Sequence, residues 1–369
     1  MSNPNNPLRK LNAAGQSVWC DHIHRGMLET GGLAAMIEDD DLRGITSNPS
    51  IFDKAISGSQ EYDALLQREL RAHPGRSSRD LFFALAIEDI RDGADVLRPV
   101  YETTGGVDGM ISLEVSPDLA NDTEGTIREA RALHARLARP NVMIKVPATV
   151  AGLPAIEQLI ADGMNINVTL LFSVVRYEAV AEAYLCGLER RLTAGQPVGR
   201  IASVASFFVS RVDAAIDPLL ADKRPDLQGK IAIANAKLAY RRYQEIFEGP
   251  RFAALKAAGA LPQRLLWAST STKNPDYPEL LYCEALIGPQ TVNTMPPATY
   301  EAFREAGRVS QTLEQDVAAA ERQIDALREI GIDLKAVTDK LEAEGVTIFV
   351  KAFDNLLHHL ESKAAKLAA

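Results

Sequence analysis

Short stretches rich in β-branched and aromatic residues alternate along the chain with longer stretches whose apolar residues recur at helical spacing. This alternation predicts repeated strand–helix units and a parallel sheet. The strand-like stretches are 18–23, 44–48, 110–115, 142–147, 166–172, 201–209, 265–270 and 291–295. Eight is the number of strands that closes a (β/α)8 barrel. The competing architecture is a doubly wound open sheet, which a Gly-x-Gly-x-x-Gly turn after a strand would favour, and no such turn follows any of these stretches. We therefore predict an α/β fold of the (β/α)8 TIM barrel type.

Two intervals between predicted strands, 49–109 and 210–264, are too long for one helix each and are predicted to be helical insertions. From residue 297 onward the apolar spacing is helical and charged residues are frequent, which predicts a C-terminal helical segment, 297–369, packed across the barrel. A chain of 369 residues accommodates one barrel with such additions, so residues 1–369 are predicted to form a single domain.

Alternate residues of a barrel strand face the axis, and this parity gathers polar side chains in the interior. Within 142–147 the β-branched residues alternate around Lys145, so Lys145 points toward the axis. By the same alternation Glu114 faces inward from the preceding strand, and Asn167 and Thr169 face inward from the next one. Three neighbouring strands are thus predicted to share one polar cluster.

A primary amine in a mostly apolar interior loses solvation of its charged form and becomes available as a neutral nucleophile. A carboxylate and a hydroxyl beside it could hold a water molecule and move protons while a carbinolamine forms and collapses. Lys145 is therefore a candidate Schiff-base lysine. The alternative is an interior ion pair between Lys145 and Glu114.

The first predicted strand permits two incompatible interpretations. With one parity, Asp21 faces the axis as a carboxylate acid/base. With the other, Cys20, His22 and His24 share a face, as in barrel hydrolases that bind a metal. A metal site needs further histidines on later strands, and none of the six histidines lies in the last four predicted strands. The parity that directs Asp21 inward is favoured, with no metal site.

One small polar loop and one arginine are candidate phosphate ligands. Residues 44–50, which are small and polar and run into a proline, predict only a loop when taken alone, whereas the similar residues 268–275 follow the seventh predicted strand. Barrels often bind phosphate after this strand, through backbone N–H groups and a nearby cation. Arg211, just past the sixth predicted strand, follows Ser206 at a spacing of five and is a second candidate, the alternative being a surface arginine.

Composition and charge narrow the functional classes. With 40 Lys+Arg against 49 Asp+Glu the formal net charge is −9, which argues against a dedicated nucleic-acid binder. Three cysteines without a CxxC spacing, no apolar leader and no run of 18 apolar residues predict a cytoplasmic protein without a membrane partner. The oligomeric state is left open between a monomer and a homodimer.

Three segments carry most of the predicted site: GITSNPS at 44–50, IKVPAT at 144–149 and NINVTLLFS at 165–173. Together they resemble the transaldolase family. The resemblance covers about residues 10–300, and the length and insertions are similar to those of the longer bacterial members, not of the short fructose-6-phosphate aldolase-like group.

The resemblance implies a class I mechanism in the pentose phosphate pathway without cofactor or metal. Lys145 would form a Schiff base with a ketose phosphate, retain a dihydroxyacetone unit and pass it to an aldose phosphate. The sugar-phosphate substrates implied are sedoheptulose 7-phosphate and glyceraldehyde 3-phosphate, giving erythrose 4-phosphate and fructose 6-phosphate. Carried onto matching positions, the family's roles make Asp21 the acid/base of C–C cleavage, and Glu114 and Thr169 the holders of the catalytic water.

The resemblance also implies substrate-binding residues. Asn48 and Asn167 would bind the dihydroxyacetone hydroxyls, with Thr46 beside them. Ser206, Arg211 and Ser269 would hold the phosphate.

The chain departs from the family pattern at one position of the phosphate site. Many relatives have an arginine two residues after the serine of the seventh strand, but here that position is Ser271 and the nearest cation is Lys273. Lysine supplies a point charge without the bidentate fork of arginine, so Lys273 is a candidate replacement.

Other functions remain open on the sequence alone. An aldolase of the same chemistry would release free dihydroxyacetone without an acceptor aldose. A metal-dependent hydrolase would use His22 and His24, and a non-catalytic barrel would form no adduct with a sugar phosphate.

Overall fold

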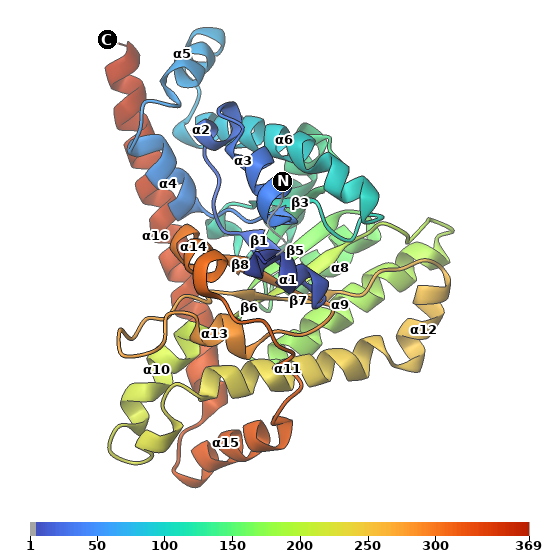
Figure 1. Ribbon diagram of the computed structural model, residues 1–369. Helices are drawn as coiled ribbons and strands as arrows, with labels where there is room; N and C mark the ends of the chain where they lie inside the picture. Colours follow the sequence, from blue (N-terminus) through green and yellow to red (C-terminus); the bar gives the residue numbers. More distant parts are fainter. Residues whose placement is uncertain (1–4, 369) are drawn as a thin grey trace.

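The computed structural model describes residues 5–368 and contains a closed barrel of parallel strands, shown in Figure 1. All eight predicted strands are present and pair in sequence order, so the predicted fold is confirmed. The strands are β1 Gln16–Cys20, β2 Gly44–Ile45, β3 Met110–Glu114, β4 Val142–Pro147, β5 Asn165–Leu171, β6 Ser203–Phe208, β7 Arg264–Ala268 and β8 Thr291–Met295. β1 begins and ends earlier than predicted, so Asp21 is the first residue after the strand.

The register across three neighbouring strands places the predicted polar cluster in one row. Glu114 of β3 pairs with Lys145 of β4, and Lys145 pairs with Asn167 of β5. Paired residues of a sheet project on the same side, so these three side chains share the barrel interior. The intervening Val142, Ile144 and Val146 are fully buried, as expected of residues that pack beneath the surrounding helices.

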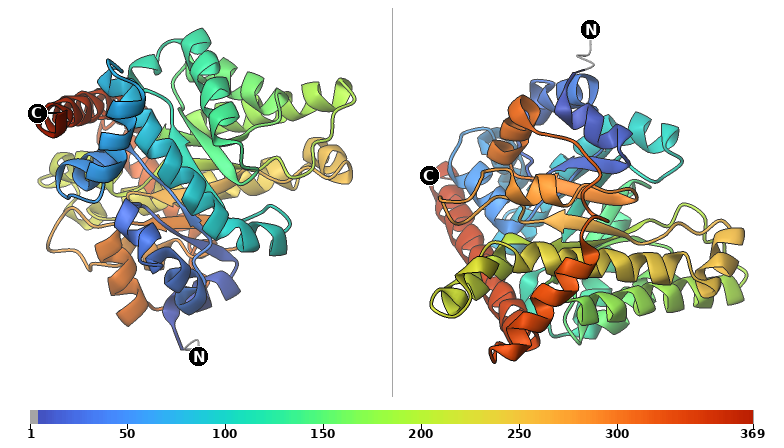
Figure 2. Two further views of the ribbon diagram at one scale, coloured as in Figure 1. Left: turned by 90° about the horizontal axis from the view of Figure 1, so that it is seen from above. Right: turned by 60° about the horizontal axis from the view of Figure 1, so that its bottom comes forward.

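Helices follow the strands and fill the two long intervals, as Figures 1 and 2 show. The helices before the last strand are α1 Pro7–Ala13, α2 Arg25–Glu29, α3 Gly32–Asp40, α4 Pro49–Ser57, α5 Asp63–Ala72, α6 Ser78–Thr103, η1 Pro117–Leu119, α7 Thr123–Leu137, α8 Gly152–Ala161, α9 Val174–Thr193, α10 Ser210–Leu220, η2 Pro225–Leu227, α11 Ile231–Phe247, α12 Pro250–Ala257 and α13 Leu281–Ala285. α4 to α6 occupy the interval between β2 and β3, and α10 to α12 occupy the interval between β6 and β7.

The chain after β8 is helical, consisting of α14 Pro297–Ala306, α15 Val317–Glu329 and α16 Leu334–Ala368. α16 has 35 residues and runs along the left side of Figure 1, where it passes α10, β5, α4 and α5. Ile348 and Phe349 of α16 line one cavity with residues that end or follow the strands, so α16 crosses the carboxyl ends of the barrel strands. Barrel enzymes hold their catalytic residues at this end.

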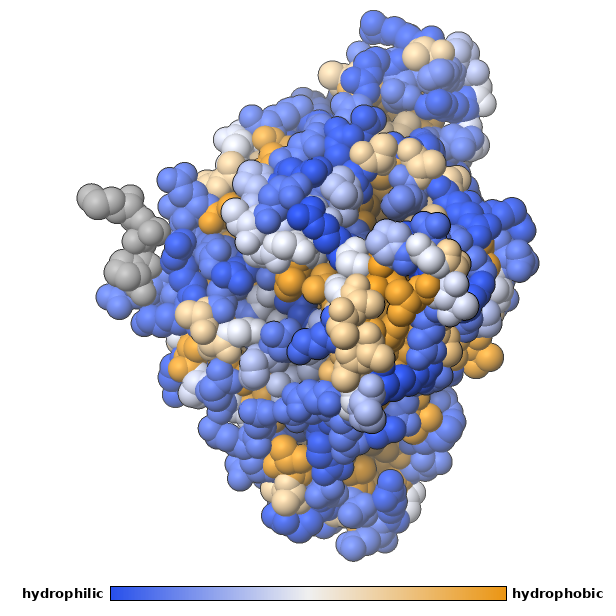
Figure 3. Space-filling view, turned by 90° about the vertical axis from the view of Figure 1, so that its right-hand side faces the viewer, coloured by the Kyte–Doolittle hydropathy of each residue, from blue (hydrophilic) through white to orange (hydrophobic). Residues whose placement is uncertain are grey.

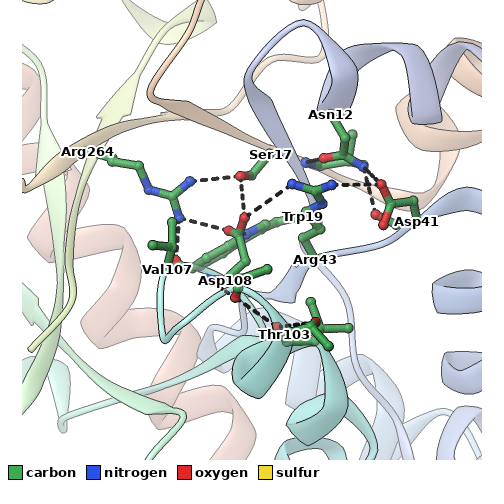
Figure 4. A network of polar contacts seen from close by, with 12 residues as sticks. Asn12, Ser17, Trp19, Asp41, Arg43, Thr103, Val107, Asp108 and Arg264 are labelled. Atoms are coloured by element: carbon green, nitrogen blue, oxygen red, sulfur yellow. Dashed lines mark hydrogen bonds and ion pairs between the residues drawn. The ribbon is translucent and has the colours of Figure 1, made fainter. Parts of the chain in front are cut away.

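A charged network fills the opposite end of the barrel, where the strands begin (Figure 4). Arg264, the first residue of β7, donates hydrogen bonds to Ser17 Oγ of β1 and to Asp108 Oδ1, at 2.7 and 2.8 Å. Ser17 Oγ donates in turn to Asp108 Oδ2 at 2.7 Å, and Trp19 Nε1 lies 3.3 Å from Asp108 Oδ1. Arg264 and Asp108 are both buried, so this ion pair is enclosed with its hydrogen-bond partners.

The molecular face opposite α16 is mostly hydrophilic, with hydrophobic residues gathered near its middle (Figure 3). Among residues 5–368, no helix combines the length and the apolar character needed to cross a lipid bilayer.

Candidate active site

A cavity of about 540 Å³ opens at the carboxyl end of the barrel. Its walls combine residues that follow the strands, residues of α4 and α10, and one turn of α16. All the predicted site residues except Glu114 and Asn167 line it: Asp21, Thr46, Asn48, Lys145, Thr169, Ser206, Arg211, Ser269 and Lys273. Glu114 and Asn167 lie just beneath, in contact with Lys145 and Ser206 respectively.

Lys145 reaches the cavity with its side chain almost entirely enclosed. The residue is 5% exposed, and its Nζ donates a hydrogen bond to the backbone carbonyl of Ser47 at 3.1 Å. Glu114 Oε2 lies 3.4 Å from the same nitrogen. The amine is thus fixed at the floor of the cavity between a carbonyl and a carboxylate, both on neighbouring strands or loops.

Burial raises the pKa of Glu114 to about 7, against the opposing charge of Lys145. Neither carboxylate oxygen has a hydrogen-bond partner within the described part of the chain, and Thr169 Oγ1 has none either. Buried polar atoms of this kind commonly bind water, so Glu114 and Thr169 are free to hold one near Lys145. A carboxyl that titrates near neutrality can both take and give a proton.

Asp21 lines the cavity, and so does His22, because both residues follow the end of β1, where the alternation of a strand no longer applies. Asp21 Oδ1 accepts a hydrogen bond from Thr46 Oγ1 at 2.6 Å, and Thr46 Oγ1 also lies 2.7 Å from Thr294 Oγ1. Burial raises the pKa of Asp21, while the charge of Lys145 and the bond from Thr46 oppose the shift.

His22 and His24 lie beside each other after β1, and His24 contacts a carboxylate. His24 Nδ1 lies 2.9 Å from Glu61 Oε2, and the two imidazole rings are tilted with centroids 5.1 Å apart. Within residues 5–368 no group of three or more His, Cys, Asp or Glu side chains is arranged to hold a metal ion.

Two amides belong to the site, Asn48 in the cavity lining and Asn167 just beneath it. Asn167 is fully buried, donates to Ser112 Oγ at 3.0 Å and accepts from Ser206 Oγ at 2.7 Å, so its orientation is fixed. Asn48 caps α4, accepting from the backbone N–H of Ile51 at 3.1 Å, with proline at the first helical position. The Asn-Pro pair of the sequence therefore explains both the turn after β2 and the place of this amide at the cavity.

The far end of the cavity carries two cations. Arg211, in the first turn of α10, and Lys273, in the loop after β7, have no carboxylate within ion-pair distance anywhere in the described chain. Partial burial lowers the pKa of Lys273, and the charge of Arg211 adds to the effect. Ser269 Oγ lies 3.0 Å from Ser210 Oγ, which joins the end of β7 to the start of α10. Uncompensated cations beside serine hydroxyls at a helix N-terminus suit a phosphate group.

Several cavity residues were not among those predicted. Thr294 of β8 was missed, although the alternation along its strand could have directed it inward. Lys54 of α4 and His22 also line the cavity, as does Phe208 at the end of β6. Ile348 and Phe349 come from α16, and no sequence pattern shows that this helix meets the barrel mouth at these residues.

The closed barrel, the buried amine and the polar cavity at the strands' carboxyl ends define an enzyme of the (β/α)8 class. The family model described as transaldolase/fructose-6-phosphate aldolase matches residues 18–360. Transaldolase 2 of Nostoc punctiforme is 47% identical, covering 98% of this chain and 99% of its own. The transaldolases of Acidothermus cellulolyticus and Thermobifida fusca are 50% and 48% identical, covering 95% and 97% of this chain and 95% and 98% of theirs.

The chain therefore belongs to the transaldolase/fructose-6-phosphate aldolase family. It is an enzyme, and its activity is that of a transaldolase. Family membership implies sugar phosphates as substrates, in accord with a cavity that combines an amine, amides, hydroxyls and free cations.

Proposed function

We propose that the enzyme transfers a dihydroxyacetone unit from sedoheptulose 7-phosphate to glyceraldehyde 3-phosphate through a Schiff base on Lys145. The observation that carries this proposal is the position of the Lys145 amine, which is 5% exposed, lies at the floor of the cavity and has Glu114 Oε2 at 3.4 Å. The products are erythrose 4-phosphate and fructose 6-phosphate, and the transfer is reversible.

In the first step the neutral amine of Lys145 adds to the ketose carbonyl at C2, and the carbinolamine loses water to give an iminium. A water held by Glu114 and Thr169 relays the protons, since both have side-chain oxygens without hydrogen-bond partners in the described chain. The raised pKa of Glu114, about 7, suits a group that takes a proton and returns it.

In the second step Asp21 accepts the proton of the C4 hydroxyl, the bond between C3 and C4 breaks, and its electron pair moves into the iminium. An aldose phosphate leaves, and a three-carbon enamine stays on Lys145. Addition of that enamine to the aldehyde of the acceptor, with Asp21 returning the proton, gives a new ketose iminium on Lys145. Water then adds at C2 of this iminium, and expulsion of the Lys145 amine releases the new ketose. The inward position of Asp21 and its bond from Thr46 support this role.

Substrate binding is divided between the two ends of the cavity. Asn48, Asn167 and Thr46 hold the hydroxyls of the dihydroxyacetone end, near Lys145. The phosphate is bound at the other end by Ser206, Arg211, Ser269 and Lys273. Lys273 supplies the second positive charge where Ser271 occupies the position of the arginine expected from the family.

The proposal is tested with Lys145→Ala, assayed for transfer from fructose 6-phosphate to erythrose 4-phosphate through the glyceraldehyde 3-phosphate formed. We expect activity below detection with a thermal unfolding curve that still shows a folded protein. Lys256→Ala, which removes an exposed amine on α12, serves as the control and keeps wild-type activity. Wild-type rates in Lys145→Ala would contradict the proposal.

We further propose that the chain is a single domain that works in the cytoplasm without cofactor or metal. Its three cysteines, Cys20, Cys186 and Cys283, are free thiols, which suits a reducing compartment. The helices of both long intervals and α16 pack on the barrel or on its outer helices, which supports one domain.

A further inference from the structure

Thr294, in β8, begins a row of hydrogen-bonded oxygens that ends at the carboxyl of Asp21. Thr294 is 4% exposed and lines the cavity. Its Oγ1 lies 2.7 Å from Thr46 Oγ1, and Thr46 Oγ1 donates to Asp21 Oδ1 at 2.6 Å. Thr46 follows β2 and Asp21 follows β1, so three neighbouring strands contribute the three members of this row.

The direction of the hydrogen bonds in the row follows from the charge of Asp21. An ionised carboxylate carries no proton, so Thr46 must donate to it. A hydroxyl has a single proton, so Thr46 then accepts from Thr294. Thr294 Oγ1 has no other hydrogen-bond partner within residues 5–368, so its proton is committed to Thr46 whenever Asp21 is ionised.

Backbone hydrogen bonds of the barrel hold the three residues in place. The N–H of Asp21 donates at 2.8 Å to the carbonyl of Met295, the residue after Thr294. The N–H of Thr46 donates at 2.9 Å to the carbonyl of Cys20, the residue before Asp21. Because the sheet fixes the backbone beside each member, the three side chains meet in a set geometry.

The row binds only one oxygen of the Asp21 carboxyl. Among the described residues, Oδ2 has no hydrogen-bond partner and is not an enclosed atom, so it is open to the cavity that Asp21 lines. A carboxyl turns about its bond to Cβ, and a bond to Oδ1 therefore also sets the direction of Oδ2. When Oδ2 carries a proton, Oδ1 still accepts from Thr46, so the carboxyl keeps its orientation between taking a proton and returning it.

We propose that Thr294 is a positioning residue for cleavage of the carbon–carbon bond, which acts through Thr46 to keep Asp21 Oδ2 directed at the substrate. The inference rests on the roles proposed above for Lys145 and Asp21. In cleavage Oδ2 takes the proton of the C4 hydroxyl, the bond between C3 and C4 breaks, and its electron pair enters the iminium on Lys145. Formation of that iminium uses the water held near Lys145 and not Asp21. Loss of the Thr294 hydroxyl therefore slows cleavage and leaves formation of the iminium intact.

The test is Thr294→Val, which replaces the hydroxyl by a methyl group. The variant is incubated with fructose 6-phosphate and borohydride, and mass spectrometry compares two reduced adducts on Lys145. The adduct of the whole hexose phosphate is trapped before cleavage, and the adduct of the three-carbon unit is trapped after it. We expect the ratio of hexose to three-carbon adduct to rise about tenfold over the wild-type ratio, and kcat for transfer to fall about tenfold with little change in KM.

Two further variants separate the hydroxyl from the packing of the strand. Thr294→Ser keeps the hydroxyl, so its adduct ratio is expected to lie within about twofold of wild type. Thr291→Val makes the same change at the first residue of β8, where the hydroxyl is fully buried and donates to the carbonyl of Gly288. This matched control loses a buried hydrogen bond away from the cavity, and its adduct ratio stays at the wild-type value.

A purely structural role of Thr294 would lower both adducts together and leave their ratio unchanged. A wild-type ratio in folded Thr294→Val, or in Thr294→Ala should the valine protein not fold, would overturn the inference. So would a ratio in Thr294→Ser as high as that in Thr294→Val. Adducts on wild-type Lys145 with an unchanged ratio in the variants refute the role of Thr294 alone, whereas the absence of any adduct on wild-type Lys145 refutes the proposed Schiff base itself.

Discussion

The carboxyl of Glu114 has a pKa near neutrality beside the amine of Lys145 because both groups are enclosed. Below pH 7 Glu114 is mostly protonated and cannot accept a proton from the catalytic water that we propose it holds with Thr169. The rate of transfer is therefore expected to fall as the pH drops through about 7. In Glu114→Gln we expect kcat to be lower by about 10²-fold or more, with the ionisation near neutrality lost from the pH profile.

The control for this prediction is Glu342→Gln. Glu342, on α16, is a half-buried carboxyl whose pKa is also raised, but it pairs with Arg176 of α9 and does not line the cavity. We expect Glu342→Gln to keep the fall in transfer rate as the pH drops through about 7. If Glu114→Gln kept that fall unchanged, the ionisation that causes it would belong to another group.

The unpaired cations at the far end of the cavity make a separate prediction. Each charge-assisted hydrogen bond to phosphate contributes about 1.5–3 kcal/mol, so Lys273→Ala raises KM for fructose 6-phosphate about tenfold to a hundredfold. Lys273→Arg, which preserves the charge, retains most of the affinity. Fructose, which lacks the phosphate, is the matched substrate. Equal losses with fructose and fructose 6-phosphate would show that Lys273 does not act on the phosphate.

At the scale of elements, two hydrogen bonds join α10 to the segment after β7 and so set the spacing of the proposed phosphate site. Tyr277 donates to Asp217 Oδ2 at 2.6 Å, and Tyr282 donates to Asp213 Oδ2 at 2.9 Å. Both carboxylates belong to α10, the helix that begins beside Arg211. Burial raises the pKa of Asp213 to about 7, although the hydrogen bond from Tyr282 opposes the shift.

Tyr277→Phe is expected to raise KM for the sugar phosphate about threefold to tenfold while kcat changes little. The substitution removes the hydrogen bond from Tyr277 to Asp217, so the loop that carries Lys273 moves relative to Arg211. Steady-state kinetics measure this split. Tyr62→Phe removes a similar bond, from Tyr62 to Asp89 at 2.6 Å in the first insertion, and is expected to reduce stability without raising KM. A fall in kcat at constant KM for Tyr277→Phe would argue against a role of the hydrogen bond between Tyr277 and Asp217 in positioning Lys273.

The sequence predicted the features that depend on a pattern within one strand or helix. It did not predict contacts between elements that are far apart along the chain. Alternation within strands was enough to place Glu114, Lys145, Asn167 and Thr169 in one interior, because pairing of neighbouring strands preserves the face of each residue. The entry of Phe349 depends on a helix more than 200 residues away along the chain from Lys145, and on the close packing of Gly345 against Leu170. Nothing in the composition of residues 334–368 reveals these partners.

For the whole molecule, we expect the two ends of the barrel to separate stability from catalysis. The network of Arg264, Asp108 and Ser17 lies where the strands begin, whereas the cavity lies where they end. Asp108→Ala leaves the buried guanidinium of Arg264 without its counter-charge, and the free energy of unfolding is expected to fall by about 3 kcal/mol or more. Urea unfolding measures the loss, and kcat per folded enzyme stays close to wild type.

The double variant Asp108→Leu with Arg264→Met removes both charges and is expected to recover part of that stability, because no unpaired charge remains in the interior. If the double variant lost as much free energy of unfolding as the two single variants together, the network would stabilise the fold by more than the neutralisation of one charge by the other. Loss of activity in folded Asp108→Ala would contradict the separation of the two ends.

The assignment of Lys145 as nucleophile is tested most directly by mass spectrometry after incubation of the enzyme with fructose 6-phosphate and borohydride. We predict a reduced dihydroxyacetone adduct, mapped by peptide analysis to Lys145 and absent from Lys145→Ala. Such an adduct establishes both the Schiff base and cleavage of the carbon chain. No adduct, or an adduct on another lysine that persists in Lys145→Ala, would contradict the mechanism.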